Sequence, residues 1–119
     1  EFTQKEVYIL ADKDLMIRVF NNLVKNAVQA IPEDRKGRVL IRVEVKDNKV
    51  IMSVQDNGSG IPEEMREKIF APNFTTKSTG MGLGLAMVKQ IVESHKGTIY
   101  FESSDQGSSF FIELDECLD

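Results

Sequence analysis

The sequence predicts an α+β fold, a two-layer α/β sandwich in which helices cover one face of a mixed sheet. Two observations lead to this prediction. Apolar residues recur at helical spacing in two long segments, and they alternate with other residues in two pairs of neighbouring segments. The segments follow the order strand, helix, hairpin, two helices, hairpin, which favours about five strands and about three helices in two layers. With 41% apolar and 29% charged positions, residues 1–119 suit a single domain.

The chain is expected to begin with a strand and a long helix. Val7–Ala11 is a short apolar run typical of a strand, and Asp12 directly after it can cap a helix. We predict that this helix covers Lys13–Ala30, because apolar residues recur there at spacings of three and four. Pro32 and Gly37 then close the segment.

A hairpin and a short helix are predicted next. Val39–Val45 and Val50–Asp56 both show the two-residue period of a strand, and Asp47-Asn48 between them is a turn signal. Pro62 followed by Glu63-Glu64 marks a helix start, and this short helix is expected to end at about Ile69.

The last third of the chain predicts a second long helix and a second hairpin. Helical spacing resumes at Leu83 and ends at Gly97. Thr98–Phe101 and Ser109–Leu114 are then expected to be strands on either side of the turn Asp105-Gln106-Gly107.

Composition excludes several kinds of partner. The formal net charge is −4 with acids and bases interspersed, so nucleic acid is not an expected partner. No apolar run approaches the roughly 20 residues that cross a bilayer, so we expect a cytoplasmic domain without direct membrane contact. The single cysteine, Cys117, is interpreted as an ordinary thiol that fits a reducing compartment. Glu1-Phe2 is interpreted as a remnant of a cloning site.

Asn22 and Asn26 are candidate functional residues, because they lie one helical turn apart at the edge of the apolar stripe. Amides in such places need partners. In a structural interpretation, both bond to neighbouring loop backbone. In a functional one, an amide oxygen ligates a hard cation such as Mg²⁺, for which water and phosphates supply most of the ligands.

The run Asp56-Asn57-Gly58-Ser59-Gly60 follows a predicted strand. Asp56 shares the parity of Val54, so its carboxylate is expected to be half-buried if that face is the core. A carboxylate beside two glycines can accept a hydrogen bond from an exocyclic amine while the backbone approaches a flat ring. A tight turn with a capping Asp is the alternative.

Phe70–Leu85 is an aperiodic stretch, rich in hydroxyl groups, that leads Gly80, Gly82 and Gly84 into a helix. Free N–H groups at a helix start make an anion site, to which Lys77 can add a charge. The spacing fits neither a P-loop nor a dinucleotide-binding fingerprint. A flexible linker is the alternative.

In this order and spacing, the motifs resemble those of the ATP-binding domain of bacterial two-component sensor histidine kinases. This Bergerat-fold domain belongs to a superfamily that includes gyrase, heat-shock chaperone and mismatch-repair ATPases. The resemblance spans nearly the whole chain. The matching segments are Asn22–Ala27 for the N box, Asp56–Pro62 for the adenine-binding box, Ile69–Phe74 for the F box, Gly80–Leu85 for the phosphate-proximal box and Gly107–Phe110 for a Gly-Thr-x-Phe segment.

The resemblance implies ATP and Mg²⁺ as cofactors. It implies that Asp56 receives the adenine amine, that Asn26 is the metal ligand, and that the lid Thr75-Thr76-Lys77 closes over the phosphates. The implied ATP-binding residues are Asn22, Lys25, Asn26, Asp56, Gly58, Gly60, Ile61, Phe70, Thr75, Thr76, Lys77, Gly80, Met81, Gly82, Leu83, Gly84, Leu85 and Ser109.

Departures from the family pattern affect the expected chemistry. Asn73 replaces a common Phe, and Met81 replaces a common Thr, so Met81 is given no polar role. Asn22 lies where the gyrase and chaperone branches have a Glu that activates water, and an amide cannot take a proton as that Glu does. We therefore predict poor ATP hydrolysis and transfer to a protein nucleophile instead.

That nucleophile, the family's phosphoacceptor histidine, lies on a separate dimerisation segment. His95 is the only histidine here, and beside Gly97 at a helix end it is interpreted as complementing the helix dipole. We therefore expect no catalytic residue for the transfer within this chain. The implied partners are the dimerisation domain of a homodimeric parent, which an inner-membrane anchor would suit, and indirectly a response-regulator receiver domain.

Two other functions fit the same residues. A serine kinase of the anti-sigma-factor type has the same nucleotide fold, and a histidine-bearing segment upstream would exclude it. A nucleotide-gated interaction module would bind ATP to order its lid without transferring phosphate.

Overall fold

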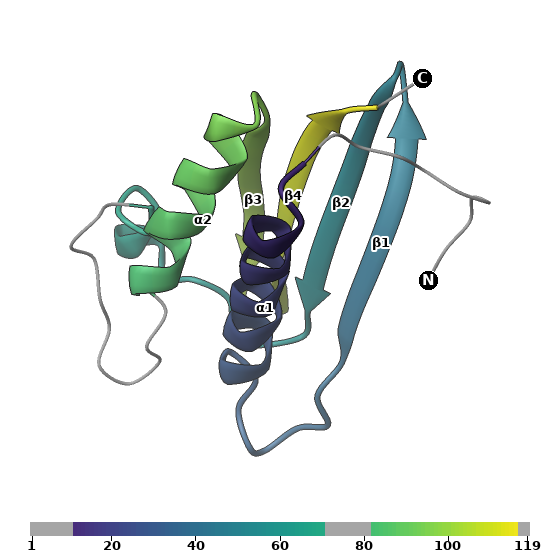
Figure 1. Cartoon of the computed structure of the whole chain (residues 1–119). Coiled ribbons are helices and arrows are strands. Elements are labelled where there is room, and N and C mark those ends of the chain that lie inside the picture. The colour runs from purple at the N-terminus through teal and green to yellow at the C-terminus, as the bar shows by residue number, and fades with distance from the viewer. Residues whose placement is uncertain (1–10, 71–81, 117–119) are drawn as a thin grey trace.

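The computed structural model describes residues 11–70 and 82–116 (Figure 1). Two α-helices and a 3₁₀ turn alternate with two hairpins, in the order that the sequence predicts. The elements are α1 (Lys13–Gln29), β1 (Val39–Lys46), β2 (Lys49–Asp56), the 3₁₀ turn Glu63–Met65, α2 (Gly82–Ser94), β3 (Thr98–Ser104) and β4 (Gly107–Asp115).

The four described strands form one sheet in the order β1-β2-β4-β3, with every neighbouring pair antiparallel. Both predicted hairpins are confirmed. The first turns at Asp47 and Asn48, whose φ angles of 54° and 63° are the left-handed values that a two-residue hairpin turn needs. The register pairs Asp56 with Val39 on one side and with Ser108 on the other.

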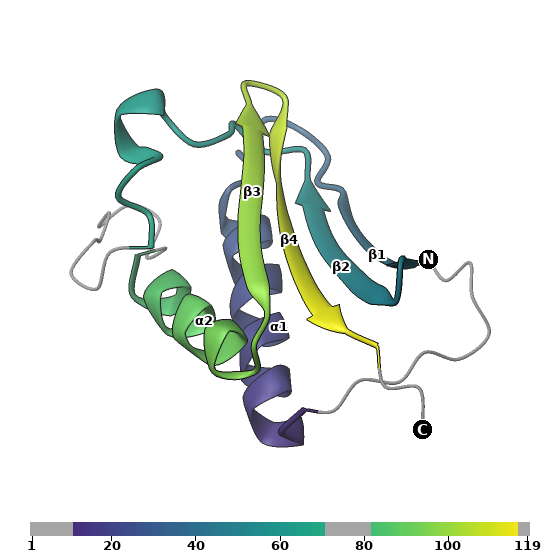
Figure 2. The same ribbon diagram turned by 90° about the horizontal axis from the view of Figure 1, so that it is seen from above.

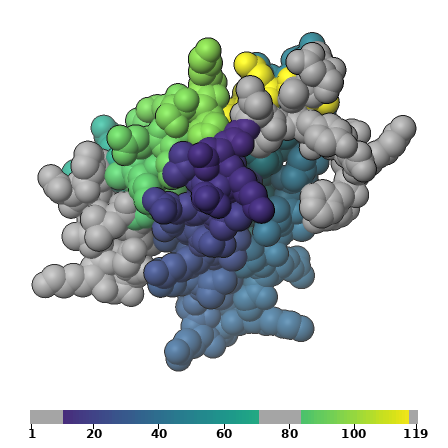
Figure 3. Space-filling view, in the orientation of Figure 1, coloured from purple at the N-terminus to yellow at the C-terminus, as the bar shows by residue number. Residues whose placement is uncertain are grey.

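Both helices lie on the same face of the sheet, so the predicted two-layer α+β fold is confirmed (Figure 2). The space-filling view shows the surfaces of α1 and α2 adjoining over the sheet (Figure 3). Alternate strand residues face the helices, and together with one stripe of each helix they form the core. Its most buried side chains are Val19, Leu23, Val50, Val54, Ile69, Leu85, Val88, Val92 and Ile112.

The element count differs from the expectation in two respects. The expected strand Val7–Ala11 lies outside the described residues apart from Ala11, and the parallel pairing of a mixed sheet is not among the described strands. The expected helix Pro62–Ile69 is only the 3₁₀ turn Glu63–Met65, and Pro62 provides no side-chain cap. So short a stretch gains little from helix propagation, and its position is instead fixed by the buried side chains of Ile61 and Ile69 at its two ends.

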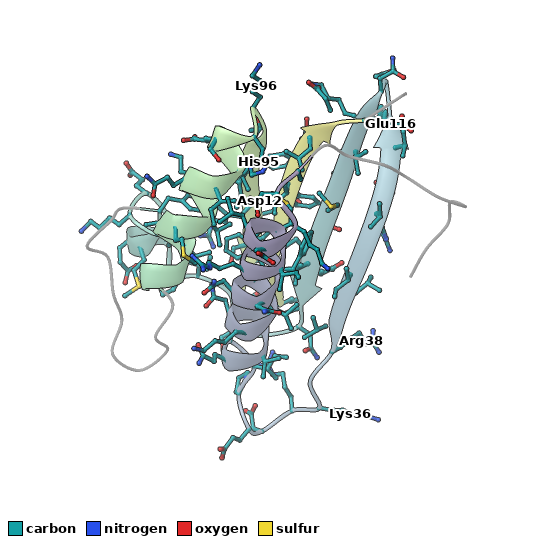
Figure 4. All side chains as sticks on the ribbon, viewed as in Figure 1. Asp12, Lys36, Arg38, His95, Lys96 and Glu116 are labelled. Atoms are coloured by element: carbon teal, nitrogen blue, oxygen red, sulfur yellow. The ribbon has the colours of Figure 1, made fainter. Side chains whose placement is uncertain are left out.

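His95 joins the end of α2 to the start of α1 (Figure 4). Its Nε2 accepts a hydrogen bond from the N–H of Asp12 at 3.0 Å, and its Nδ1 lies 2.8 Å from the carbonyl oxygen of Ile91. Because Nε2 acts as an acceptor, the proton is on Nδ1, which donates to Ile91. These contacts support a structural role for His95, through hydrogen bonds to both ring nitrogens.

Candidate functional site

Asp56 is a buried carboxylate at the end of β2. Its side chain lies with Val54 on the helix-facing side of the sheet, as strand parity predicts, and the residue is only 6% exposed. Its Oδ1 accepts hydrogen bonds from the N–H groups of Gly58 at 2.8 Å and Ser108 at 3.2 Å. Neither of these bonds uses Oδ2. A carboxylate fixed in this way can receive an N–H donor from a ligand.

Burial dominates the electrostatics of Asp56. It raises the pKa of the carboxyl above its usual value, while the hydrogen bonds from Gly58 and Ser108 lower the pKa in part. A hydrogen bond to a desolvated acceptor is electrostatically stronger than the same bond in water, because the local dielectric constant is lower. The site therefore suits recognition of an amine that donates a hydrogen bond to this carboxylate.

Gly58 and Gly60 lie where no side chain fits. A Cβ on Gly58 would overlap the carbonyl oxygen of Ala30 at the end of α1. Gly60 has a φ of +84°, and a Cβ there would overlap the carbonyl oxygen of Ser104 at the end of β3. The glycines thus let the segment after β2 pass closely between a helix end and a strand end.

The final hairpin supports this segment through two serines that sequence reasoning missed. The N–H of Ile61 donates to Ser103 Oγ at 2.7 Å, and Ser103 Oγ lies 3.0 Å from Ser108 Oγ. Ser109, which the resemblance implies as an ATP-binding residue, lies by strand alternation on the sheet face away from the helices, and its role in binding stays a prediction. Ser108 shares the parity of the buried Phe110, a signal that the sequence already contained.

Asn26 and Asn22 project from α1, and their side-chain amides differ in hydrogen bonding. Asn26 is 5% exposed, and its Nδ2 is the buried side-chain polar atom without a hydrogen-bond partner within residues 11–70 and 82–116. Asn22 donates from Nδ2 to the carbonyl oxygen of Arg18 at 2.8 Å. A Cβ on Gly84 would overlap Asn22 Oδ1, so the first turn of α2 packs directly on this amide.

The unpartnered amide of Asn26 fits a site for a cation beside phosphate. A buried amide without a partner is costly unless a ligand satisfies it. Rotation of the amide exchanges its oxygen and nitrogen, so Asn26 can offer an oxygen to Mg²⁺ or an N–H to a phosphate. The described part of the chain has no cluster of three or more His, Cys, Asp or Glu residues for a metal. A cation here would depend on an amide, water and phosphate oxygens, a ligand set that suits Mg²⁺.

The phosphate-proximal end of the site is described in part. Gly82 begins α2, while Leu85 is fully buried in the core, so only the backbone of Leu85 is available to a ligand. Phe70 meets Phe101 and Phe110 edge-on, with ring centroids 6.0 and 6.4 Å apart. These contacts fix the start of the segment that leads to α2.

The remaining predicted residues have no structural test. Lys25 is exposed on α1, and nothing in its surroundings assigns it a ligand. The side chain of Leu83 is outside the description, and so are the residues Thr75, Thr76, Lys77, Gly80 and Met81 in their entirety.

The two-layer fold, with Asp56 and Asn26 buried between a sheet and two helices, is that of an ATP-binding domain. Residues 11–117 match the family described as histidine kinase-, DNA gyrase B-, and HSP90-like ATPase, and the chain belongs to this family. Sensor histidine kinase ZraS of Klebsiella oxytoca is 45% identical over 104 residues, which cover 87% of this chain and 22% of ZraS. Similar relatives include sensory histidine kinase/phosphatase NtrB of Azospirillum brasilense, 35% identical over 89% of this chain, and signal transduction histidine-protein kinase AtoS of Escherichia coli, 42% identical over 76% of this chain. The chain spans 30% of the length of NtrB and 15% of that of AtoS.

Solved structures agree with this assignment. The catalytic domain of histidine kinase ThkA has a TM-score of 0.85 and 38% identity, with 97% of this chain and 76% of that chain covered. A structure of ThkA in complex with the response regulator protein TrrA has a TM-score of 0.81 and 36% identity, with 98% of this chain and 33% of that chain covered. No helix among the described residues has both the length and the apolar composition needed to cross a membrane.

Proposed function

We propose that residues 1–119 are the catalytic ATP-binding domain of a two-component sensor histidine kinase. This domain binds Mg-ATP and donates the γ-phosphate to a histidine on a separate dimerisation domain. The observation that carries the proposal is the presence, in a chain of this family, of a buried carboxylate, Asp56, and of a buried amide, Asn26, whose nitrogen has no hydrogen-bond partner among the described residues. One suits the amine of adenine, and the other suits Mg²⁺ beside phosphate.

Asp56 selects adenine by accepting its exocyclic amine, while Gly58 and Gly60 let the backbone lie close to the ring. Asn26 holds Mg²⁺, which when bound neutralises phosphate charge. The N–H groups of Gly80–Gly84 surround the phosphates, and Thr76 or Lys77 contacts the γ-phosphate. All of these roles are proposals, and positions 76, 77, 80 and 81 lie outside the described residues.

The chain orients phosphate without activating water. Asn22 lies on α1 one turn before Asn26, and its amide is bonded to the backbone of Arg18. An amide cannot act as the general base that hydrolysis needs. Slow hydrolysis preserves ATP for a protein nucleophile, which phosphoryl transfer requires mainly to be positioned in line with the leaving group.

The proposed partners are the dimerisation and phosphoacceptor domain of a homodimeric parent and, after it, a response-regulator receiver domain. The complex of histidine kinase ThkA with TrrA supports the second partner, because the ThkA chain contains a domain similar to this one. We propose that the domain works in the cytoplasm, a location compatible with an inner-membrane anchor elsewhere in the parent.

Phosphate transfer in trans tests the proposal. The domain is mixed with the histidine-bearing dimerisation segment of its parent and γ-labelled ATP. We expect label on the histidine, recognised by its acid lability, and no label on this chain alone. ATP binding without transfer would favour a nucleotide-gated interaction module, and label on a serine would favour a kinase of the anti-sigma-factor type.

Asn26→Ala is expected to remove the magnesium dependence of ATP binding. In the wild-type domain, chelation of Mg²⁺ should weaken binding by about tenfold or more, roughly 1.4 kcal/mol. In the variant, binding should be as weak as in the chelated wild type, with or without Mg²⁺. The stability of the nucleotide-free domain should change by only about 1 kcal/mol, because the substitution also removes an unsatisfied buried donor.

Calorimetric titration with and without a chelator measures both constants, and urea unfolding measures stability. Asn21→Ala is the matched control, because Asn21 is exposed on the same helix. A variant at position 26 that keeps the full response to Mg²⁺ would remove Asn26 from the metal site.

A further inference from the structure

Asn57 lies between Asp56 and Gly58, and both the oxygen and the nitrogen of its side-chain amide form hydrogen bonds with the loop that joins α1 to β1. We call residues 31–38 the α1–β1 loop. The N–H of Arg38 donates to Asn57 Oδ1 at 2.8 Å, and Asn57 Nδ2 donates to the carbonyl oxygen of Lys36 at 2.9 Å. The N–H of Asn57 donates to the carbonyl oxygen of Arg38 at 3.2 Å. The amide of Asn57 thus acts as an extra peptide group that extends the β1–β2 pairing into the loop.

The α1–β1 loop and the C-cap of α1 also hold the two residues that follow Asn57. Arg35 Nη1 donates to the carbonyl oxygen of Asn57 at 3.0 Å and lies 3.4 Å from that of Gly58. The N–H of Ser59 donates to the carbonyl oxygen of Ala30 at 3.2 Å. The α1–β1 loop projects at the lower end of the molecule, where Figure 4 shows Lys36 in the loop and Arg38 next to the start of β1. Residues 57–59 are therefore fixed from one side by backbone and guanidinium contacts.

These contacts determine where the carboxylate of Asp56 can point. Asp56 Oδ1 accepts the N–H of Gly58, so the position of Gly58 sets one of the two bonds that orient the carboxylate. Gly58 already lies so close to Ala30 that a Cβ on it would overlap the Ala30 carbonyl oxygen, so the segment around Gly58 has little freedom to shift toward α1. Without the side-chain bonds of Asn57, the segment at Gly58 is held by fewer contacts, among them the contact with Arg35 and the bond from Ser59 to Ala30. A shift of Gly58 then weakens its bond to Asp56, while the bond from Ser108 stays in place.

We propose that Asn57, assisted by Arg35, is a positioning residue for adenine selection. It acts on the nucleotide through Gly58 and Asp56, because its own amide is used by the backbone of Lys36 and Arg38. The α1–β1 loop thereby becomes an adjustable part of the nucleotide site. This role rests on the proposed assignment of Asp56 to adenine.

Base selectivity separates this role from a purely structural one. Asp56 accepts a hydrogen bond from the amine of adenine, whereas guanine has a carbonyl oxygen at the same ring position. A variant that only lowers stability, or that disturbs the phosphate end, weakens ATP and GTP binding by the same factor. A variant that misplaces Asp56 weakens ATP binding alone.

The test measures Kd for Mg-ATP and Mg-GTP by calorimetry in the wild-type domain, Asn57→Ala, Asn57→Asp and Arg35→Ala. For Asn57→Ala we expect ATP binding to weaken by about 3- to 10-fold, with GTP binding changed by less than about twofold. Asn57→Asp retains an acceptor for the N–H of Arg38, so its affinity for ATP should lie between those of the wild type and Asn57→Ala. Arg35→Ala removes the bonds to two carbonyl groups and an exposed ion pair with Asp34, and its ATP affinity should fall by about 2- to 5-fold, so it serves if Asn57→Ala fails to fold.

Asp12→Ala is the stability control. Asp12 caps α1 by accepting the N–H of Leu15 at 3.0 Å, and it lies at the opposite end of this helix from the α1–β1 loop (Figure 4). It should lose stability without a change in the ratio of ATP to GTP affinity. Equal loss of ATP and GTP affinity in Asn57→Ala, or unchanged ATP affinity, would overturn the positioning role. Failure of the wild-type domain to bind ATP would instead overturn the proposed function.

Discussion

Asp56→Asn is expected to weaken ATP binding by about 10- to 150-fold while leaving the nucleotide-free domain at least as stable as the wild type at neutral pH. The first effect follows from the loss of a charge-assisted hydrogen bond to the adenine amine, worth about 1.5–3 kcal/mol. The new amide can keep its oxygen in the place of Oδ1, where Gly58 and Ser108 both donate. Its nitrogen then takes the place of Oδ2, so that two hydrogen-bond donors, the amide of Asn and the amine of adenine, face each other.

The second effect follows from the raised pKa of Asp56. Burial raises this pKa in the folded state, so between the unfolded and folded pKa values the folded chain holds more protons. The stability that Asp56 contributes is therefore fully present at a pH below its pKa in the unfolded state. It is lost as the pH rises through its pKa in the folded state. At neutral pH the ionised carboxylate is a cost to folding that Asn does not have.

Urea unfolding of both proteins across this pH window measures the difference. We expect the advantage of Asp56→Asn to be present at pH 7 and to shrink as the pH falls and Asp56 becomes protonated. Asp47→Asn is the matched control, because Asp47 is exposed in the turn at the other end of β2. A large loss of stability in Asp56→Asn at pH 7 would mean that the charge supports the fold, and its role in binding would need another explanation.

Periodic features were predictable from the sequence. The helical spacing of apolar residues predicted α1 to within one residue at its end, and strand alternation predicted both hairpins and the burial of Asp56. These predictions succeeded because burial of one face imposes a period of 3.6 or 2 on any helix or strand beside a core. The same reasoning placed Asn26 at the edge of the stripe, where it is buried.

Long-range contacts were not predictable in this way. Asn57 bonds to Lys36 and Arg38, and Ser103 bonds to Ile61, through single contacts between distant segments that leave no period in the sequence. The short helix after Pro62 was overestimated because start signals alone do not stabilise a helix without an amphipathic face to pack. The sequence therefore predicted which polar residues of the candidate site are buried better than it predicted the residues that hold them in place.

Gly60→Ala is expected to cause the largest loss of stability among single methyl additions at the candidate site. A φ of +84° costs an L-residue about 1–2 kcal/mol, and the added Cβ would overlap the carbonyl oxygen of Ser104. That oxygen is a backbone atom of β3, and Ser104 is paired with Gly107 of β4. The overlap therefore cannot be relieved by rotating a side chain. Overpacking adds about 1–3 kcal/mol, for a total of about 2–5 kcal/mol.

Thermal unfolding of the nucleotide-free domain measures this loss, and we expect Tm to fall by roughly 10 °C or more. Gly37→Ala is the matched control, because a Cβ there meets only the flexible side-chain end of Ile31, at 3.1 Å. Its Tm should change by only a few degrees. Where Gly60→Ala remains folded, ATP binding should still be weaker than in the wild-type domain, because relief of the overlap moves the backbone between Gly58 and Ile61. Equal Tm values for the two variants would show that β3 yields to the methyl group and that the close approach at Gly60 is not required.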